Sequence, residues 1–474
     1  MKKIITIMAL MSVCMTSFAQ DVTVAELTPE MTGKLTTSYQ QVAFNLFQEV
    51  DRTEDGNICF SPLSAQIALL MMQNGAGGNT LSQMQKALGT EGVSSDAVNL
   101  YNQSLFNILT YRPDFDPSQW RWSGAESDEE ARKHYEAFYP LCEIANALWN
   151  RHDVVVKSPF TDCLQSYYNA GTGSVAFDTQ EGIDYVNGWV NEHTHGLIPQ
   201  IYAEPQSPDL ALVLANSLYL KAAWAVPFWK ELTTKENFYK EDGTVVQTDM
   251  MFVSDPTFRI AEVGSFKCVR IPYSNLFYMT VFMPADGYQL PEISYNDWIQ
   301  AIERFLEKLY TDVGVNLKLP KFEIGGQYDL IPVLKTLGMK DAFTPLCDFT
   351  AVCEKNLPIS AVFQLDKIKV DEEGTEAAAV TVIEATESVG PSKVVDFFVD
   401  RPFYFTIENL RTNTLLFMGK VTNPAEGNSG QPTKISDIPA GEKNTGIFDL
   451  SGRPLRQVPE QGFYIQNGRK FLRR

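Results

Sequence analysis

Imidazole groups are well suited to proton transfer and metal binding near neutral pH, and this sequence contains four histidines. Two of them, His193 and His195, lie close together in the segment EHTHG, where a predicted helix ends. Such a pair can bind a metal ion, but a polar helix terminus explains it more simply. No Cys-x-x-Cys pair or Cys/His cluster with zinc-ligand spacing occurs in the chain. The sequence therefore predicts no metal site and no cofactor.

Sequence patterns for nucleophilic catalysis and phosphate binding are also absent. The chain has no HExxH or GxSxG motif, and GAGGNT at residues 75–80 lacks the Gly-Lys-Ser/Thr of a phosphate loop. Glu372 and Glu373 are adjacent, and adjacent side chains on an extended chain point to opposite faces. They are therefore poorly placed as an acid–base pair, and we expect both carboxylates to be solvated. We expect a protein that is not an enzyme.

Length and charge restrict the class of protein further. The chain has 474 residues and a net charge of -19, with 44% hydrophobic and 20% charged residues. This composition is ordinary for a globular protein, and the length alone suggests about two or three domains. The negative charge disfavours nucleic acids and acidic membranes as partners.

The N-terminus has the pattern of an export signal. Lys2 and Lys3 precede the apolar run 4–13, and the small-x-small triplet 17–19 follows it. We expect a signal peptide over residues 1–19, an N-terminal extension over 20–34, and an extracellular, periplasmic or cell-surface protein. The apolar run is too short to span a bilayer.

Seven cysteines are present, and Cys14 lies in the signal, which leaves six. An even number in an exported chain permits disulfides, and Cys347 and Cys353 are close enough in sequence to bridge. Buried free thiols are the alternative.

Hydrophobic spacing and turn residues predict the order of the secondary-structure elements. A polar, proline-containing segment over residues 112–137 is expected to be an inserted loop, and 426–446 a turn-rich linker. Asn467 and Gly468 predict a β-hairpin in the tail 447–474. Helices are expected over 38–50, 61–74, 79–89, 183–198, 295–310 and 329–339. Strands are expected over 210–224, 268–274, 276–284 and 315–324.

The segment VDEEGTEAAAVTVIEATES, residues 370–388, is the most informative part of the chain. Acidic residues and a glycine precede a block of small side chains and then β-branched ones. Such a segment can exist as an exposed loop, and it can also be accepted as a strand inside a sheet. If it does both, the protein is a single-use mechanical device.

Motifs along the chain occur in the order found in one family. NICFSPLSAQIALLMMQNGAGGNTLSQMQKAL (57–88), LANSLYLKAAWAVPF, LPKFEI, DEEGTEAAAVT, RPFYFTI and LFMGKVTNP resemble serpins. The resemblance covers roughly residues 35–425. It implies one serpin domain of mixed α+β class, with three β-sheets, eight to nine helices and an exposed reactive-centre loop. It also implies that length overestimates the number of domains.

The resemblance implies a suicide-substrate inhibitor of serine proteases, or in some members cysteine proteases. The protease forms an acyl-enzyme on the loop, which then inserts as a new strand into the main sheet and traps the protease. Side chains alternate faces along a strand. One face of the expected insert is free of charge: Thr375, Ala377, Ala379, Thr381, Ile383 and Ala385. The other face carries both acids: Glu376, Ala378, Val380, Val382, Glu384 and Thr386.

By the same resemblance, the hinge begins at Glu372, Glu373 and Gly374. The reactive bond falls sixteen residues after Glu372, between Ser388 and Val389, with Thr386 and Glu387 as alternatives. These residues favour elastase-like, subtilisin-like or Glu-specific proteases. A polar cluster under the centre of the main sheet, where its strands part, is implied at Ser61, Ser64, Asn216 and Gln364, and Trp224 matches a tryptophan near the loop's entry point. Gln364 stands where many serpins have histidine, and a hydrogen bond to Asn216 is possible.

Two other functions are compatible with the sequence. One is a non-inhibitory carrier or binding protein with a serpin fold, and the small hinge residues argue against it. The other is a surface adhesion module, because the tail resembles short C-terminal β-tails of exported proteins from Gram-negative bacteria. An inert hairpin explains the tail equally well. We expect an exported, bacterial-type, monomeric inhibitor.

Overall fold

The structure is a computed structural model. It describes residues 27–208, 210–255, 258–307, 313–375 and 393–426, and four short strands near the C-terminus. The chain divides into two compact units, Met1–Gln431 and Pro432–Arg474. The second unit contains one small sheet in the order β18-β17-β19-β20. Its strands are β17 (Ile447–Phe448), β18 (Pro454–Leu455), β19 (Gly462–Gln466) and β20 (Arg469–Arg473).

The main sheet of the first unit has the order β11-β12-β13-β4-β2-β3. Its long central strand β4 is antiparallel to β2, and no residue of β4 is exposed. The two-residue strand β13 is antiparallel to both of its neighbours, β12 and β4. The strands are β2 (Leu141–Asn150), β3 (Ala170–Ser174), β4 (Leu212–Ala223), β11 (Phe322–Asp329), β12 (Phe363–Val370) and β13 (Gly374–Thr375).

Two further sheets complete the β-structure of this unit. One has the order β1-β16-β15-β9-β8-β7, and the other has the order β14-β10-β6-β5. The first comprises β1 (Ile58–Phe60), β7 (Arg259–Val263), β8 (Phe266–Pro272), β9 (Phe277–Pro284), β15 (Phe403–Asn409) and β16 (Thr414–Val421). The second comprises β5 (Thr234–Tyr239), β6 (Val245–Asp255), β10 (Val313–Pro320) and β14 (Lys393–Phe398).

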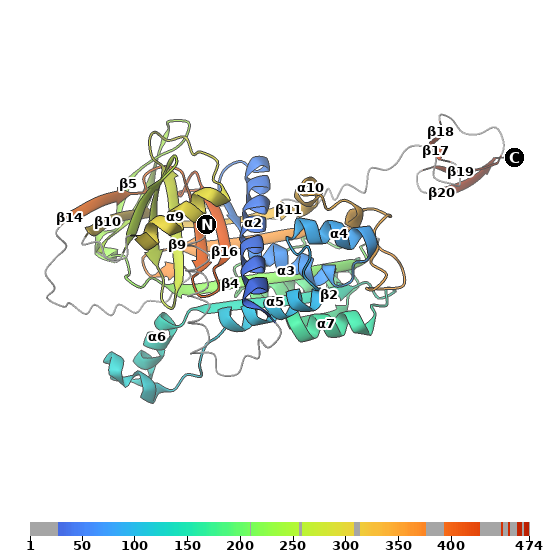
Figure 1. Ribbon diagram of the computed structural model, residues 1–474, viewed down its shortest axis with the longest axis horizontal. Helices are drawn as coiled ribbons and strands as arrows, with labels where there is room; N and C mark the ends of the chain where they lie inside the picture. Colours follow the sequence, from blue (N-terminus) through green and yellow to red (C-terminus); the bar gives the residue numbers. More distant parts are fainter. Residues whose placement is uncertain are drawn as a thin grey trace. The chain divides into compact units, whose positions relative to one another are not determined.

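Nine α-helices are found among the described residues, and Figure 1 shows most of them beside the main sheet. They are α2 (Pro29–Thr53), α3 (Pro62–Gln73), α4 (Gly78–Ala87), α5 (Ser95–Leu109), α6 (Asp128–Phe138), α7 (Ser158–Tyr168), α8 (Gln180–His193), α9 (Tyr295–Glu307) and α10 (Leu330–Thr336). The described part of the first unit therefore confirms the predicted mixed α+β fold with three sheets and eight to nine helices, and it has nine.

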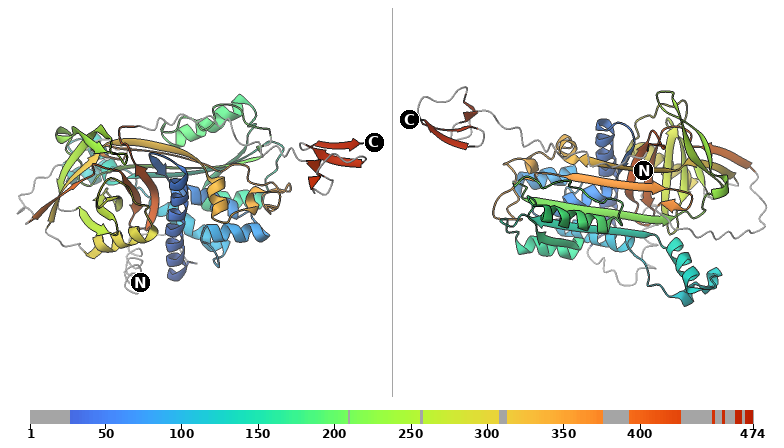
Figure 2. Two further views of the ribbon diagram at one scale, coloured as in Figure 1. Left: turned by 90° about the horizontal axis from the view of Figure 1, so that it is seen from above. Right: turned by 180° about the vertical axis from the view of Figure 1, so that it is seen from behind.

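Helices cover both faces of the main sheet, which explains the burial of β4. Ser64 of α3 donates to Asn216 on one face of β4, whereas Ser217 on the other face donates to the His193 carbonyl at the end of α8. Figure 2 shows α3 and α8 on opposite sides of the sheet. We define the face toward α3 as the inner face and the face toward α8 as the outer face.

The prediction of a loop over residues 112–137 was wrong. This segment contains the short 3-10 helix Pro117–Ser123 and most of α6, which projects from the body of the unit in Figure 1. The Ser127 side chain caps α6 by accepting a hydrogen bond from the Glu130 amide (3.1 Å). Trp120 and Tyr135 pack edge to face inside a small separate core. Local capping and aromatic packing order the segment in spite of its polarity.

The predicted strand over residues 315–324 is two strands in different sheets. Pro320 ends β10 in the smaller sheet, and after Lys321 the chain enters the main sheet as β11. Proline removes a backbone donor, which favours a break at this position. Periodicity alone does not reveal such a change of sheet, because both halves alternate.

The described part of the chain contains no helix long and apolar enough to cross a membrane. Its six cysteines are free thiols, and five of them are buried. Of the two alternatives for these residues, the structure therefore shows thiols, with no bridge between Cys347 and Cys353.

Candidate functional site

The predicted hinge begins inside the main sheet. Gly374 and Thr375 form β13 and fill the top of a space between β4 and β12. Thr375 is aligned with Ala222 of β4 and with Val370 of β12, and its side chain is buried. Gly374 has φ 155°, and a Cβ atom there would collide with the Ala222 carbonyl oxygen. The position therefore requires glycine.

The two acidic residues at the start of the hinge, Glu372 and Glu373, are paired with lysine side chains. Glu372 is buried, accepts a hydrogen bond from Thr233 Oγ1 (2.8 Å) and pairs with Lys321 Nζ (2.8 Å). Burial alone would raise the pKa of Glu372, but the bonds from Lys321 and Thr233 and the backbone outweigh it and lower the pKa. Glu373 pairs with Lys230. The expectation that these two carboxylates are solvated was therefore wrong.

Trp224 lies against the same turn, as the resemblance implies. Its indole Nε1 donates to the Asp371 carbonyl (2.9 Å), and its backbone amide donates to the Glu373 carbonyl (2.9 Å). The indole stacks on Tyr273 with ring centroids 4.1 Å apart. The Tyr273 hydroxyl in turn hydrogen-bonds Thr375 Oγ1 (2.5 Å). The start of β13 is thus fixed by aromatic stacking and hydrogen bonds together.

From Thr375 toward the N-terminal ends of β4 and β12, no strand among the described residues lies between these two strands. Further down, the N-terminal turn of α3 meets the inner face of the sheet. Ser61 caps α3 and donates to the Leu416 carbonyl (2.7 Å), and Ser64 donates to Asn216. Asn216 itself donates to Asn146 Oδ1 of β2 (2.6 Å). These polar contacts join α3 to β4 and β2.

Gln364 does not hydrogen-bond Asn216. Its amide nitrogen donates to both carboxylate oxygens of Asp366, at 2.9 and 3.0 Å. Gln364 and Asn216 instead line a cavity of about 30 Å³, together with Ala65, Leu69, Leu214 and Val362 among others. Asp366 was not among the predicted site residues. A charged residue two positions after Gln364 shares its face of the strand, and that spacing was the available signal.

The other predicted site residues lie outside the described residues. They include most of the hinge and the whole expected reactive bond. They are Glu376, Ala377, Ala378, Ala379, Val380, Thr381, Thr386, Glu387, Ser388 and Val389.

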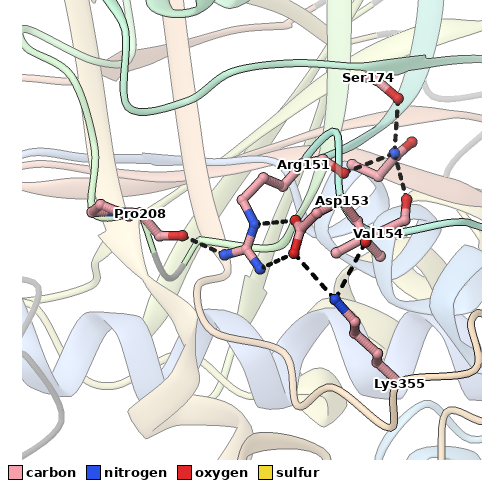
Figure 3. A network of polar contacts seen from close by, with 7 residues as sticks. Arg151, Asp153, Val154, Ser174, Pro208 and Lys355 are labelled. Carbon is pink, nitrogen blue, oxygen red and sulfur yellow. Dashed lines mark hydrogen bonds and ion pairs between the residues drawn. The ribbon is translucent and has the colours of Figure 1, made fainter.

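A separate network of charges lies at the end of the main sheet opposite β13 (Figure 3). Arg151 follows β2 and bonds both the Pro208 carbonyl and the Asp153 carboxylate. Lys355, from the segment before β12, reaches Asp153 Oδ2 at 3.1 Å. Bonds from Arg151 and then Lys355 hold the pKa of Asp153 well below its usual range. The network joins the segments that lead into β4 and β12.

The described residues contain no cluster of three or more His, Cys, Asp or Glu side chains able to hold a metal ion. His195 pairs with Glu143 (2.6 Å), and His193 stacks on Trp189. The first contact joins the end of α8 to β2, and the second lies within α8 itself.

The fold is mixed α/β, and its main sheet is open between the long strands β4 and β12. The hinge begins in that opening. These features together define the class of protein. The profile of the family described as Serpin (serine protease inhibitor) matches residues 37–424. The chain belongs to the serpin family.

Individual relatives agree with this assignment. The chain is similar to Iripin-2 of Ixodes ricinus, with 29% identity over 82% of this chain and 93% of that protein. It is similar to Serpin-ZXA of Oryza sativa subsp. japonica, with 32% identity over 78% and 90%. Among solved structures, human thyroxine-binding globulin complexed with thyroxine superposes with a TM-score of 0.69, at 25% identity over 83% of this chain and 100% of that chain. The native state of tengpin, a thermophilic serpin, gives a TM-score of 0.67, at 27% identity over 82% and 94%.

The similar proteins include tick, plant and bird serpins. They do not support the expectation of a bacterial exported type.

Proposed function

We propose that this serpin is a suicide-substrate inhibitor of serine endopeptidases, with cysteine endopeptidases as a second target class. The loop after Thr375 is the bait, and its insertion between β4 and β12 traps the acyl-enzyme. The observation that carries the proposal is the register of β13 within the main sheet.

Thr375 is aligned with Ala222 and Val370. If the chain continues antiparallel in this register, each further residue moves one step back along β4 and β12. Six steps take Thr375 to Thr381, Ala222 to Asn216 and Val370 to Gln364. Thr381 would therefore enter the space between the two residues that line the cavity.

The alternation of the insert matches the faces of the sheet. Aligned residues on neighbouring strands point to the same face. Thr375 and its partners Ala222 and Val370 are all buried, and so are Leu220 and Ile368 two positions along. The uncharged set of loop residues that begins with Thr375 would therefore face the core.

The charged set of loop residues would face outward. In the same register, Glu376 is level with Lys221 of β4 and Lys369 of β12, one step before Ala222 and Val370. Lys369 is exposed and Lys221 is half-buried. A carboxylate between two ammonium groups favours insertion electrostatically. This agreement of size, charge and register favours the inhibitory class.

The target is a protease that accepts the residues around the reactive bond. With Ser388 before the bond, elastase-like or subtilisin-like proteases are the expected partners, and with Glu387 a Glu-specific protease. Trypsin-like proteases need a basic residue there. The N-terminal signal supports export, so that the protein would meet these proteases outside the cytoplasm.

A carrier function is the second candidate. One of the similar structures is thyroxine-binding globulin in complex with thyroxine, so the fold also occurs in a binding protein. The small, uncharged inward set after Gly374 favours inhibition over this alternative, because a carrier needs no insertable loop.

The experiment that separates the two functions is incubation with an elastase-like protease, followed by denaturing electrophoresis. We expect a covalent complex that survives SDS, with a mass equal to protease plus most of the serpin. Cleavage of the chain without any such complex, across elastase-like, subtilisin-like and Glu-specific proteases, would refute inhibition of these targets.

A further inference from the structure

Asp366 is a buried acid on the inner face of β12, and no part of the serpin resemblance accounts for it. Its residue is 6% exposed. Its carboxylate accepts the Ser61 backbone amide at 2.8 Å, and both of its oxygens accept from Gln364 Nε2. It forms no ion pair within the described ranges of the chain. An ionised carboxylate at this position is therefore held only by neutral donors.

The groups that pack around Asp366 leave it as the titrating member of the cluster. Tyr328 of β11 and Cys59 of β1 are its titratable neighbours, and burial raises the pKa of both well above the ordinary values. They stay protonated at neutral pH. Lys367 and Lys369 are on the outer face of β12, and the contacts from α3 and β4 come from neutral serine and asparagine side chains. Burial raises the pKa of Asp366 to about 7 in spite of its hydrogen bonds.

The charge on Asp366 decides which end of the Gln364 amide faces it. An ionised carboxylate only accepts, so Gln364 must direct its amide nitrogen toward Asp366, as observed. A protonated carboxyl can donate to the Gln364 oxygen, so that the side-chain amide can flip and exchange the positions of its oxygen and nitrogen. The amide nitrogen would then face the cavity that Gln364 shares with Asn216. The cavity has room for about one water, so a direct or a water-bridged contact can form.

We propose that Asp366 is a positioning residue for sheet opening, which acts through Gln364 on the contact between β12 and β4. The protonated acid lets Gln364 donate toward Asn216 and hold the strands together. The ionised acid withdraws that donor and leaves the strands easier to part. Because opening admits the loop, this inference rests on the proposed inhibitory function.

The sign of the pH effect follows from the raised pKa. An acid that binds its proton more tightly in the folded state stabilises that state at low pH, and this stability is lost as the pH rises through about 7. The native form should therefore be harder to open below neutrality than above it. Loop insertion should be slower on the acid side for the same reason.

The test compares the wild-type protein with Asp366→Asn. Asparagine keeps an acceptor for Ser61 and supplies a fixed donor to the Gln364 oxygen, so it imitates the protonated acid at every pH. We measure the melting temperature and the rate of covalent-complex formation between about pH 6 and about pH 8.5. The ratio of wild-type to variant rates at each pH cancels the protease's own pH profile.

The rate ratio should rise about threefold or more across this range, while the melting temperature of the wild type falls relative to that of the variant. A flat ratio together with parallel melting curves would overturn the proposal. All other titratable groups are identical in the two proteins, so the comparison isolates the change at Asp366.

Two further variants keep the proposal testable if Asp366→Asn does not fold. Glu323→Gln removes an exposed carboxylate from the neighbouring strand β11, where it pairs with Lys367, and it should keep the wild-type profile. Gln364→Leu retains the acid but removes the amide, so the rate should lose its pH dependence while the melting temperature keeps it. If the rate of Gln364→Leu follows that of the wild type at every pH, Gln364 does not transmit the charge and the proposal is wrong.

If the wild type forms no covalent complex at any pH, the proposed function fails and the Asp366 proposal as stated falls with it. The melting curves then decide the remaining part, which is whether Asp366 makes the native state pH-sensitive. If the complex forms but the ratio is flat, only the role of Asp366 fails.

Discussion

Replacing Thr375 with arginine tests the insertion mechanism at the position where the hinge meets the sheet. Thr375 is 1% exposed, and its hydroxyl bonds Tyr273 (2.5 Å) between Ala222 and Val370. The nearby carboxylates of Glu372 and Glu373 are already paired with Lys321 and Lys230. An arginine at this position would either bury an unpaired charge or remain outside the sheet.

The expected effect is large because insertion competes with hydrolysis of the acyl-enzyme. An unpaired buried charge costs several kcal/mol. If about 3 kcal/mol of this cost is present in the transition state for insertion, the step slows by about a hundredfold. Hydrolysis then wins, and the variant becomes a substrate that is cleaved without trapping the protease.

The assay is the number of serpin molecules consumed per protease inhibited, together with the yield of SDS-stable complex. The matched control is Ala378→Arg, which adds the same side chain to the outward set of the loop. We expect the control to keep most of its complex and Thr375→Arg to lose nearly all of it. An equal yield for both variants would refute the assignment of faces.

Three other changes test separate parts of the account. Lys321→Ala leaves the buried Glu372 without its cation, and it should lower the free energy of unfolding by about 1–3 kcal/mol at neutral pH. Because the pKa of Glu372 is lowered, this loss should shrink as the pH falls below the range in which Glu372 is ionised. Chemical denaturation at two pH values checks this prediction. An unchanged free energy of unfolding at neutral pH would contradict it. Ser388→Arg should redirect inhibition toward trypsin-like proteases in a progress-curve assay, and retained elastase specificity would mean that the reactive bond lies elsewhere. Asp153→Ala removes the anion that joins Arg151 to Lys355, and its exposed contacts predict a melting temperature within a few degrees of the wild type; a much larger fall would show that this network holds the far end of the sheet.

The sequence was sufficient for the class of fold and for most elements, for reasons that particular residues make clear. Strand β4 is almost wholly apolar because both of its faces are covered, and this composition predicts a buried strand. Glycine occupies position 374 because a larger side chain would collide with Ala222. The ordered motifs that resemble serpins then supplied the arrangement of sheets. Local patterns alone joined β10 and β11 into one strand.

The missed features depend on contacts between residues far apart in the chain. Glu372 was expected in solvent but is buried. Its carboxylate is stabilised there by Lys321, which directly precedes β11, and by Thr233, which directly precedes β5. The sequence allowed a hydrogen bond from Gln364 across the sheet to Asn216, whereas the partner is Asp366 on the same strand as Gln364. Burial and pairing of this kind appear only when the three-dimensional neighbours are known.

If the loop inserts as proposed, the uncut serpin is metastable and gains stability when the cleaved loop joins its main sheet. The most direct measurement is the melting temperature of the protein before and after a protease cuts the loop near Ser388. We expect a melting transition tens of degrees higher after cleavage, because a complete central strand replaces the space between β4 and β12. Equal melting temperatures for the two forms would contradict it.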